Sequence, residues 1–469
     1  MKPRMFLKKQ PVWLGALGLT LGLSGTFLTP VVQAQSPVIS TKAVTPLASV
    51  LPQTLPETLP NPLTLDYVLS LPLNQHPQVL MQKAQVDQIR VQKTLQSATD
   101  KTQLNLVGRL GRRDYAEETQ NHNLAALRIT QKLYDFNQNG LLVEALETRQ
   151  QAQQMLAMDS EKQLKLQIMQ AYFNVLLADF QYRIDNEAMA IAYVALDKAK
   201  DRLDLKRISD VTYLEIETEY ETILVTRTRS GYRQLQSRLM LANLIGLPQA
   251  RPDELALPKL ASFSQRNIDE MTLESLQQKV LDLNPNIQAL KQQVQARLLE
   301  LESNQARNKP TFSVDAWAGQ LSSYPELREG RWKIGLMVDM PLYDGGSIEA
   351  KSSQVKANIQ QLNAQMQLQE QALRDEVASL YFQLKMLRSE QTQNQKFGDY
   401  SDLYLDFSRA LYENESATDL GDAMVRLSQA NYNQIDWQFK QALLWSKLDL
   451  LMANPIQVAV PVQQTENVK

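Results

Sequence analysis

The sequence repeats itself once, and this duplication constrains the fold more than any other feature. Matched positions carry the same or similar residues 208 or 209 positions apart: His76-Pro77 with Asn284-Pro285, Leu133-Tyr134-Asp135 with Leu342-Tyr343-Asp344, Tyr172-Phe173 with Tyr381-Phe382, and Asp210-Val211 with Asp419-Leu420. Solenoid and propeller repeats have periods of roughly 20–50 residues. The spacing in this chain is several times longer, so it predicts a duplicated domain.

The clearest strand signal lies at residues 332–342, where every second residue is large and apolar: Trp332, Ile334, Leu336, Val338, Met340 and Leu342. A period of two predicts a strand with one apolar face. A strand needs about 9–11 residues to cross a bilayer, and strands of membrane barrels alternate apolar with polar residues. Taken alone, the pattern also suits a half-buried strand of a soluble sheet.

Each half of the duplication predicts the same order of elements: a helix, two strands, a very long helix, a tip and a returning helix. The strands are expected at about residues 102–134 and 311–343, and the long helical hairpins at about 141–246 and 347–453. Residues 141–230 contain no glycine and no proline, and residues 141–205 alone would form a helix roughly 100 Å long. Apolar residues take alternate steps of four and three, as in a coiled-coil seam, at Leu164, Ile168, Ala171, Val175 and Ala178.

The N-terminus has the features of a secretory signal: basic residues, an apolar run at residues 12–28, and the small-residue site Val32-Gln33-Ala34. We expect cleavage after Ala34, and an uncleaved membrane anchor is the alternative. The expected segments are the signal at 1–34, a proline-rich linker at 35–62, the first repeat at 63–246, a connector at 247–271, the second repeat at 272–453 and a C-terminal tail at 454–469.

Four strands cannot close a barrel, and open strand edges cannot face lipid. If the strands lie in a membrane, several chains must pool them, and three chains would provide twelve strands. We therefore predict a membrane α+β protein, an internally duplicated protomer that gives four strands to a shared trimeric 12-stranded β-barrel. The long helices would continue it as an α-helical coiled-coil barrel on one side of the membrane. Lys333, Gly335, Met337 and Asp339 would face the lumen.

Several local motifs together resemble those of the TolC-like outer-membrane efflux proteins. They are LYDFNQNG and PLYDGGS at the strand-to-helix turns, AYFNVLLA and SLYFQLK on the long helices, and ISDV and ATDLGDA at the tips. The resemblance implies a homotrimer in the cell outer membrane, in contact with its lipid, with the helical part in the periplasm. It also implies a passive exit duct for drugs or secreted proteins, docked to a periplasmic adaptor and an inner-membrane pump of the ABC, RND or MFS type.

The same resemblance assigns roles to residues at the helical tips. It places a pore constriction at Asp419 and Asp422, where three chains would form an acidic ring that attracts cations. It places the tip latch and adaptor contact at Asp210, Ser209, Thr418 and Glu415. The alternative for Asp419 and Asp422 is capping of a helix N-terminus, which acidic residues also favour. The strand-to-helix turns are expected at Asp135, Gly140, Asp344, Gly345 and Gly346.

The sequence offers little for catalysis. It has no cysteine and only His76 and His122 as histidines, and none of the HExxH, GxxxxGK[ST], GxGxxG or GxSxG motifs is found. We expect no enzyme activity, no cofactor and no metal site. The net charge of −2 gives no reason to expect a nucleic-acid partner. The competing function is a periplasmic adaptor subunit, which should contain a single helical hairpin flanked by split β-domains.

Overall fold

The computed structural model describes residues 59–114, 119–121, 123–250, 252–322, 329–414 and 420–455. All of them belong to one compact unit, Gln53–Lys469. The expected signal, most of the linker and nearly all of the C-terminal tail lie outside these ranges. Glu415, Thr418 and Asp419, three of the expected tip residues, lie outside them too.

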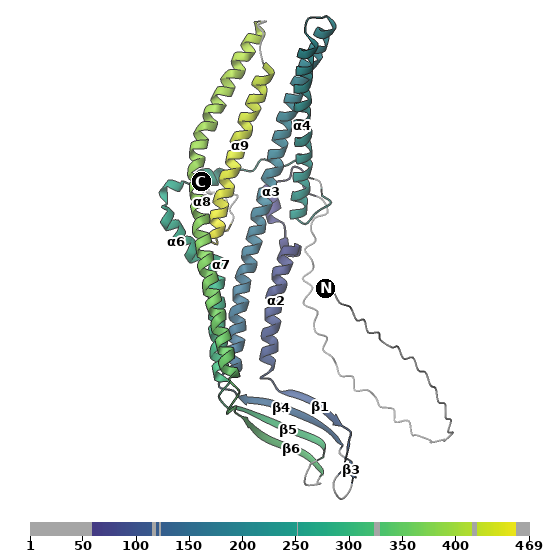
Figure 1. Ribbon diagram of the computed structural model, residues 1–469, viewed down its shortest axis with the longest axis vertical. Coiled ribbons are helices and arrows are strands. Elements are labelled where there is room, and N and C mark those ends of the chain that lie inside the picture. The colour runs from purple at the N-terminus through teal and green to yellow at the C-terminus, as the bar shows by residue number, and fades with distance from the viewer. Residues whose placement is uncertain are drawn as a thin grey trace, which may run out of the picture. The chain divides into compact units, whose positions relative to one another are not determined.

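The described elements follow the order expected for each half of the chain (Figure 1). The first half contains α1 (Leu65–Ser70), α2 (Pro77–Ala98), β1 (Gln103–Arg109), β2 (Arg112–Asp114), β3 (Thr119–Asn121), β4 (Leu124–Tyr134), α3 (Gln138–Asp204) and α4 (Asp210–Leu244). The second half contains α5 (Ala261–Ser264), α6 (Leu273–Leu283), α7 (Pro285–Ala306), β5 (Thr311–Ser322), β6 (Glu329–Asp339), α8 (Ser347–Glu413) and α9 (Leu420–Leu451). Short 3-10 turns lie at Leu73–Gln75 and Ile268–Glu270.

Two pairs of equivalent helices have equal lengths in the two halves. Both α2 and α7 have 22 residues, and both α3 and α8 have 67, which corresponds to about 100 Å for each long helix. The shorter pair also starts in the same way, because a proline occupies the first helical position after a side chain that caps the helix. That cap is His76 before α2 and Asn284 before α7.

The two helical hairpins pack against each other through α3. This helix contacts α2, α4, α7 and α9, whereas α8 contacts α6, α7 and α9 (Figure 1). The largest apolar core lies where α3 and α9 meet, and its biggest fully buried side chains include Tyr172, Phe173, Phe439 and Trp445. The chain before α1 is held to this core, since the Oη of Tyr172 lies 2.7 Å from the carbonyl oxygen of Leu63.

The four long strands form one antiparallel sheet in the order β1-β4-β5-β6. Gly319 adopts a φ of +144° where the pairing of β5 with β6 shifts register, and a Cβ there would lie 2.4 Å from the carbonyl oxygen of Ala125. Only glycine tolerates both conditions. Strand β6 ends at Asp339, three residues before the alternating pattern does. Pro341 accounts for this difference, because proline has no N–H to donate to a ladder.

Candidate functional site

Apolar side chains line up across all four strands on one face of the sheet. The register forms one row of Leu106, Leu127, Ala318 and Trp332, and a second row of Leu104, Ile129, Ala316 and Ile334. Leu106 is 79% exposed and Trp332 is 72% exposed. A protein that keeps such a large apolar surface uncovered normally uses it to meet another protein or a membrane.

The opposite face of the sheet is polar and internally bonded. Arg128 Nε lies 2.6 Å from a carboxylate oxygen of Asp315, and the guanidinium lies over the ring of Trp317, 5.0 Å from its centroid. Trp317 donates its indole N–H to the same carboxylate, and Thr130 lies within 3.3 Å of it. The sheet therefore has one apolar and one polar face, as the alternation in the sequence predicts.

Both outer strands of the sheet keep an open edge. Within the described residues, β1 pairs only with β4, and β6 pairs only with β5. Each open edge presents unpaired backbone N–H and C=O groups, which can pair with another strand.

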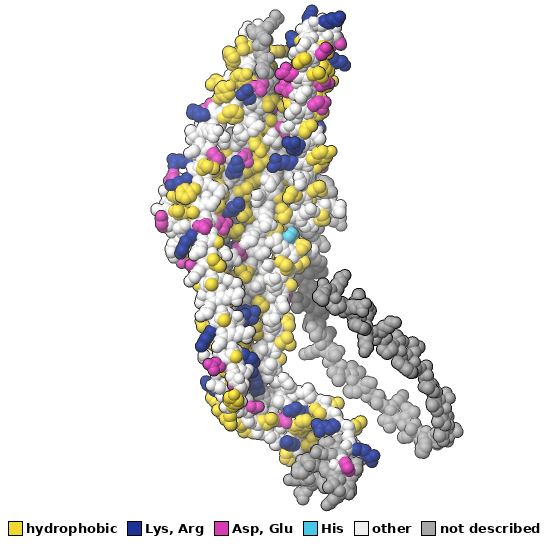
Figure 2. All heavy atoms as spheres, in the orientation of Figure 1, with side chains coloured by type: hydrophobic (Ala, Val, Ile, Leu, Met, Phe, Trp, Pro, Cys, Tyr) yellow, Lys and Arg dark blue, Asp and Glu magenta, His cyan; other side chains and the backbone are white. Residues whose placement is uncertain are grey.

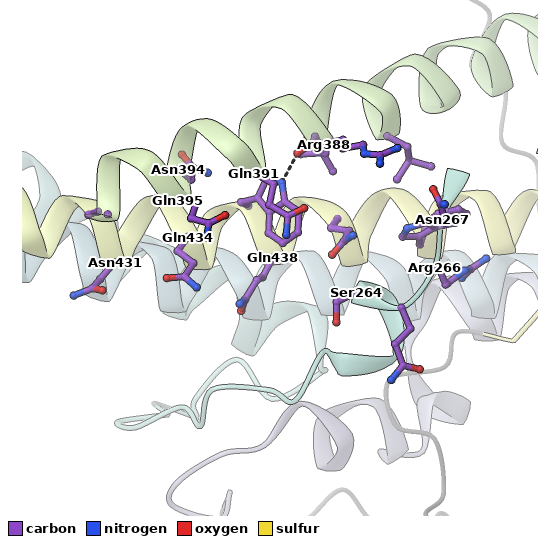
Figure 3. A pocket seen from close by; sticks show the side chains of 18 of the residues that line it. Ser264, Arg266, Asn267, Arg388, Gln391, Asn394, Gln395, Asn431, Gln434 and Gln438 are labelled. Carbon is purple, nitrogen blue, oxygen red and sulfur yellow. Dashed lines mark hydrogen bonds between the residues drawn. The ribbon is translucent and has the colours of Figure 1, made fainter. Parts of the chain in front are cut away.

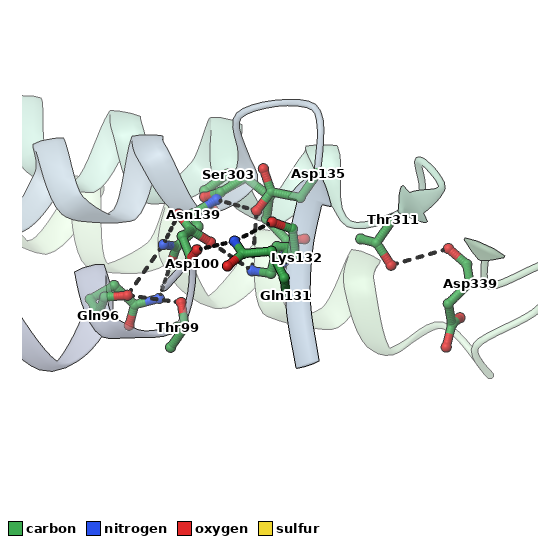
Figure 4. Close-up of polar contacts among 11 residues, drawn as sticks. Gln96, Thr99, Asp100, Gln131, Lys132, Asp135, Asn139, Ser303, Thr311 and Asp339 are labelled. Carbon is green, nitrogen blue, oxygen red and sulfur yellow. Dashed lines mark hydrogen bonds and ion pairs between the residues drawn. The ribbon is translucent and has the colours of Figure 1, made fainter. Parts of the chain in front are cut away.

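The first strand-to-helix turn is built around Asp135, which is 8% exposed (Figure 4). Its carboxylate accepts the backbone N–H of Asn139 at 3.0 Å and lies 3.3 Å from the ammonium of Lys132. Asn139 is buried and bonds in turn to Gln96 at the end of α2. Asn139 lies within the LYDFNQNG motif, but its role could not be read from the sequence, because a buried amide in a helix start resembles an ordinary polar helix residue.

The second turn repeats this geometry with a more open environment. The carboxylate of Asp344 accepts the backbone N–H groups of Gly346 at 2.9 Å and Ile348 at 2.6 Å. These backbone hydrogen bonds hold the pKa of the Asp344 carboxyl below its usual value. Gly345 and Gly346 have φ angles of +67° and +80°, the left-handed conformation that glycine adopts most readily.

Gly140 does not occupy the matching place in the first turn. The left-handed positions there are Phe136 and Asn137, with φ angles of 53° and 65°. Gly140 lies inside α3 instead, where a Cβ would come within 2.1 Å of the side-chain oxygen of Asn137. Its small size is needed because Asn137 folds over the first turn of the helix.

The described tip residues are partly or fully exposed and act locally on their own helices. Ser209 caps α4 by accepting the backbone N–H of Thr212 at 3.1 Å, and Asp210 is the first residue of that helix. Asp422 lies in the first turn of α9 and pairs with Arg426 at 2.6 Å. Arg426 is a partner that no motif in the sequence marks, although its spacing of four residues from Asp422 is that of a helical ion pair.

The long helices differ in how well their equivalent positions are covered. Phe173 of α3 is 1% exposed, whereas Phe382, its counterpart in α8, is 60% exposed. The same contrast separates α4 from α9: Leu214, Leu235 and Leu239 are exposed, and their counterparts Ala423, Leu444 and Leu448 are buried. Within one chain α9 covers α3, and no described element covers the corresponding face of α8.

A polar groove accompanies the second helical hairpin. It has a volume of about 730 Å³ and lies between α8, α9 and the segment around α5 (Figure 3). Carboxamide side chains dominate its lining: Gln391, Asn394, Gln395, Asn431, Gln434, Gln438 and Gln441. The described residues contain no cluster of three or more His, Cys, Asp or Glu that could hold a metal ion. None of the described helices combines the length and the apolar character needed to cross a bilayer.

Comparison with known proteins adds the decisive observation, because residues 276–454 match the family described as outer membrane efflux protein. The resemblance to TolC-like outer-membrane efflux proteins is therefore confirmed. A curated outer membrane efflux protein, BepC from Brucella suis, is 22% identical over 268 residues, which cover 56% of this chain and 57% of that protein. The alignment thus spans little more than half the length of that relative.

Solved structures extend the likeness to most of the chain. A membrane protein from Pseudomonas aeruginosa superposes with a TM-score of 0.67 at 18% identity, covering 83% of this chain and 92% of that one. The CmeC outer membrane channel from Campylobacter jejuni gives 0.67 at 12% identity, with 84% and 87% covered. The MtrE outer membrane channel from Neisseria gonorrhoeae, solved in its open state, gives 0.62 at 17% identity, with 84% and 89% covered. The chain has the TolC-like fold.

Proposed function

We propose that the chain is one subunit of a passive outer-membrane exit duct. Three copies would pool their sheets into a 12-stranded barrel in the outer membrane, and their long helices would enclose a tunnel in the periplasm. Cargo would be supplied by an inner-membrane pump through a periplasmic adaptor. The channel and efflux descriptions of the similar proteins support this proposal, and the two hairpins α3–α4 and α8–α9 favour it over a single-hairpin adaptor.

One observation carries the proposal: the apolar face of a sheet with two open edges is exposed to the surroundings. An exposed apolar face is unfavourable in water, by roughly 25 cal/mol for each Å². It is favourable in lipid, but open edges are not, because lipid supplies no hydrogen-bond partners for their backbone groups. Joining β1 of one copy to β6 of the next satisfies both requirements at once.

The helices also favour association between copies, because they too leave apolar side chains uncovered. In one chain α9 covers α3, and the duplication relates this pair to α4 and α8. A second copy could therefore place its α4 against the uncovered face of α8. Exposed apolar residues of α4 recur in a seven-residue pattern at Val211, Val225, Tyr232 and Leu239, and this spacing suits packing against another long helix.

The gate is proposed to lie at the helical tips, with Asp422 as a described member and Asp419 as its neighbour in sequence. The pairing of Asp422 with Arg426 offsets part of the negative charge that a ring of such residues would carry. Replacing both aspartates with alanine should lower the preference for cations and the block by divalent cations in planar bilayers. Arg426→Gln should have the opposite effect, since it frees the Asp422 carboxylate. Unchanged ion selectivity in both variants would leave these aspartates as helix caps.

The overall proposal is tested by fractionation together with electrophoresis of unheated samples. The mature protein should appear in the outer-membrane fraction and migrate as a trimer that resists SDS until heated. A monomer in the periplasmic or inner-membrane fraction would contradict the proposal and favour the adaptor. Purification with a crosslinker should then identify the adaptor and the pump.

A further inference from the structure

Basic residues outnumber acidic residues on the polar face of the sheet. Among the residues whose side chains the structure describes, the basic members are Arg109, Arg128, Lys132, Arg331 and Lys333, and the acidic members are Asp315 and Asp339. The strand register puts them on one side, because each lies an odd number of residues along its strand from a member of the apolar rows. Lys and Arg side chains are visible on this part of the molecule in Figure 2.

The two acidic residues can offset only part of the basic charge on this face. Asp315 is engaged by Arg128 at 2.6 Å, and Lys132 is paired with Asp100 and Asp135 at the helical end of β4. Arg331 and Lys333 are exposed, and neither forms an ion pair with a described side chain. Asp339 is exposed at the other end of the same strand. Among the described side chains, Arg331 and Lys333 therefore place two positive charges close together on this face.

Lys333 also lies in a row of paired residues that crosses all four strands of the sheet. The register aligns Asn105, Arg128, Trp317 and Lys333 across the four strands. Trp317 thus has a cationic side chain on each neighbouring strand, and Asp315 is already bonded to both Arg128 and Trp317. A solute that passes over this row meets positive charge and an indole ring.

We propose that the polar face of the sheet is a cationic lining that favours the passage of anionic solutes, with Arg331 and Lys333 as the residues that set this preference. The inference rests on the proposed duct, in which this face borders the lumen. It assigns to the barrel end a preference opposite to that of the acidic tip. Cargo would then meet two charge filters of opposite sign in series.

The expected signature depends on salt, because the reach of a charge is set by the Debye length. That length is about 30 Å at 0.01 M and about 3 Å at 1 M ionic strength. Charges on the wall of a wide barrel should therefore act on permeating ions in dilute salt and lose their influence in concentrated salt. If Arg331 or Lys333 had only a structural role, the effect of replacing it on ion selectivity would not depend on the salt concentration in this way.

The test is the chloride-to-potassium permeability ratio in planar bilayers under a KCl gradient. The double variant Arg331→Gln, Lys333→Gln should lower the ratio by about twofold or more in dilute KCl, as expected for charges roughly 10 Å from the permeating ion. The effect should disappear near 1 M. The double variant Arg331→Lys, Lys333→Arg keeps both charges and should behave as the unmodified protein.

Three negative outcomes are distinguishable. If the unmodified protein forms SDS-resistant trimers and conducting channels, but the glutamine variant leaves the permeability ratio unchanged in dilute salt, the cationic lining is wrong and the duct stands. If the unmodified protein forms neither trimers nor channels, the duct itself is wrong. A ratio that falls equally at all salt concentrations in both double variants would indicate a structural change and would also overturn the lining.

Discussion

Phe173 stacks face to face on Phe439, with the ring centroids 4.2 Å apart and the planes 5° from parallel. This contact joins α3 of the first half to α9 of the second half. The counterpart of Phe173 in the second half is Phe382, which stands exposed on α8. The equivalent phenylalanine is thus a core residue in the first half of the chain and a surface residue in the second half.

Replacing these two phenylalanines should separate folding from assembly. Phe173→Ala should destabilise the protomer by about 3–5 kcal/mol, the usual cost of removing a buried aromatic side chain. Phe382→Ala should leave the protomer fold intact and lower the temperature at which the SDS-resistant trimer dissociates. Circular dichroism melting and gel electrophoresis after graded heating measure the two effects. If Phe382→Ala leaves the dissociation temperature of the trimer unchanged, Phe382 does not lie in the contact between α4 and α8 of neighbouring copies.

A charge on the apolar face of β6 should impair membrane insertion. Leu336→Lys should cost about 2–4 kcal/mol if its side chain faces the bilayer midplane. Met337→Lys, one residue further along, places the same charge on the polar face and should be tolerated. Recovery of each variant in the outer-membrane fraction provides the comparison. Equal recovery of both variants would mean that the face carrying Leu336 is wet.

Acidification should weaken the start of α2 through His76. Its Nδ1 accepts the backbone N–H of Gln78 at 3.3 Å, which requires the neutral ring, and burial lowers the pKa of the imidazole below its usual 6.5. The folded state therefore binds the proton less readily than the unfolded state. The resulting stability is present above pH 6.5 and is lost as the pH falls through that value towards the lowered pKa.

The control for this effect is built into the duplication. Asn284 caps α7 at the matching position with an amide oxygen that does not titrate. His76→Asn should therefore keep the cap and flatten the dependence of the melting temperature on pH between about 7 and 5. An unaltered pH dependence in this variant would assign the effect to other groups.

Asp159 should respond to pH in the opposite direction. Burial raises the pKa of its carboxyl, although the side-chain amides of Gln163 and Asn286 donate to it at 2.8 and 3.4 Å. The folded state binds the proton more readily than the unfolded state, so this group costs stability at neutral pH and less as the pH falls through the raised pKa. Asp159→Asn retains an oxygen for both amides and should raise the melting temperature at pH 7 but not at pH 3. A lower melting temperature at pH 7 would show that the charge is needed.

Local patterns in the sequence were sufficient for most of the fold. The alternation in β6, the absence of glycine and proline from α3, and the X-Pro starts of α2 and α7 each follow from backbone or side-chain chemistry within a few residues. The early end of β6 followed from Pro341, and the alternation concealed it because Met340 and Leu342 keep the period without belonging to the strand.

The candidate site was less predictable, because its contacts join distant parts of the chain. Arg128 and Asp315 are 187 residues apart in sequence, and Gln96 and Asn139 meet across the sheet–helix turn. The left-handed residues of the first turn could not be read from its glycine, because Phe136 and Asn137 take that conformation and Gly140 lies inside α3. The pairing of Arg426 with Asp422 was available from their spacing in the helix.

The helices α3 and α8 have equal lengths of 67 residues each. Their lengths therefore set the same distance from the sheet to the tip in both halves of the chain. An insertion of seven residues preserves the coiled-coil phase and lengthens a helix by about 10 Å. An insertion in one helix alone would extend one tip beyond the other, so a partner that binds both tips would meet an uneven surface. The same insertion in both helices would move both tips outward by an equal distance. The long helices of the two halves must therefore change length together if the two tips are to stay level.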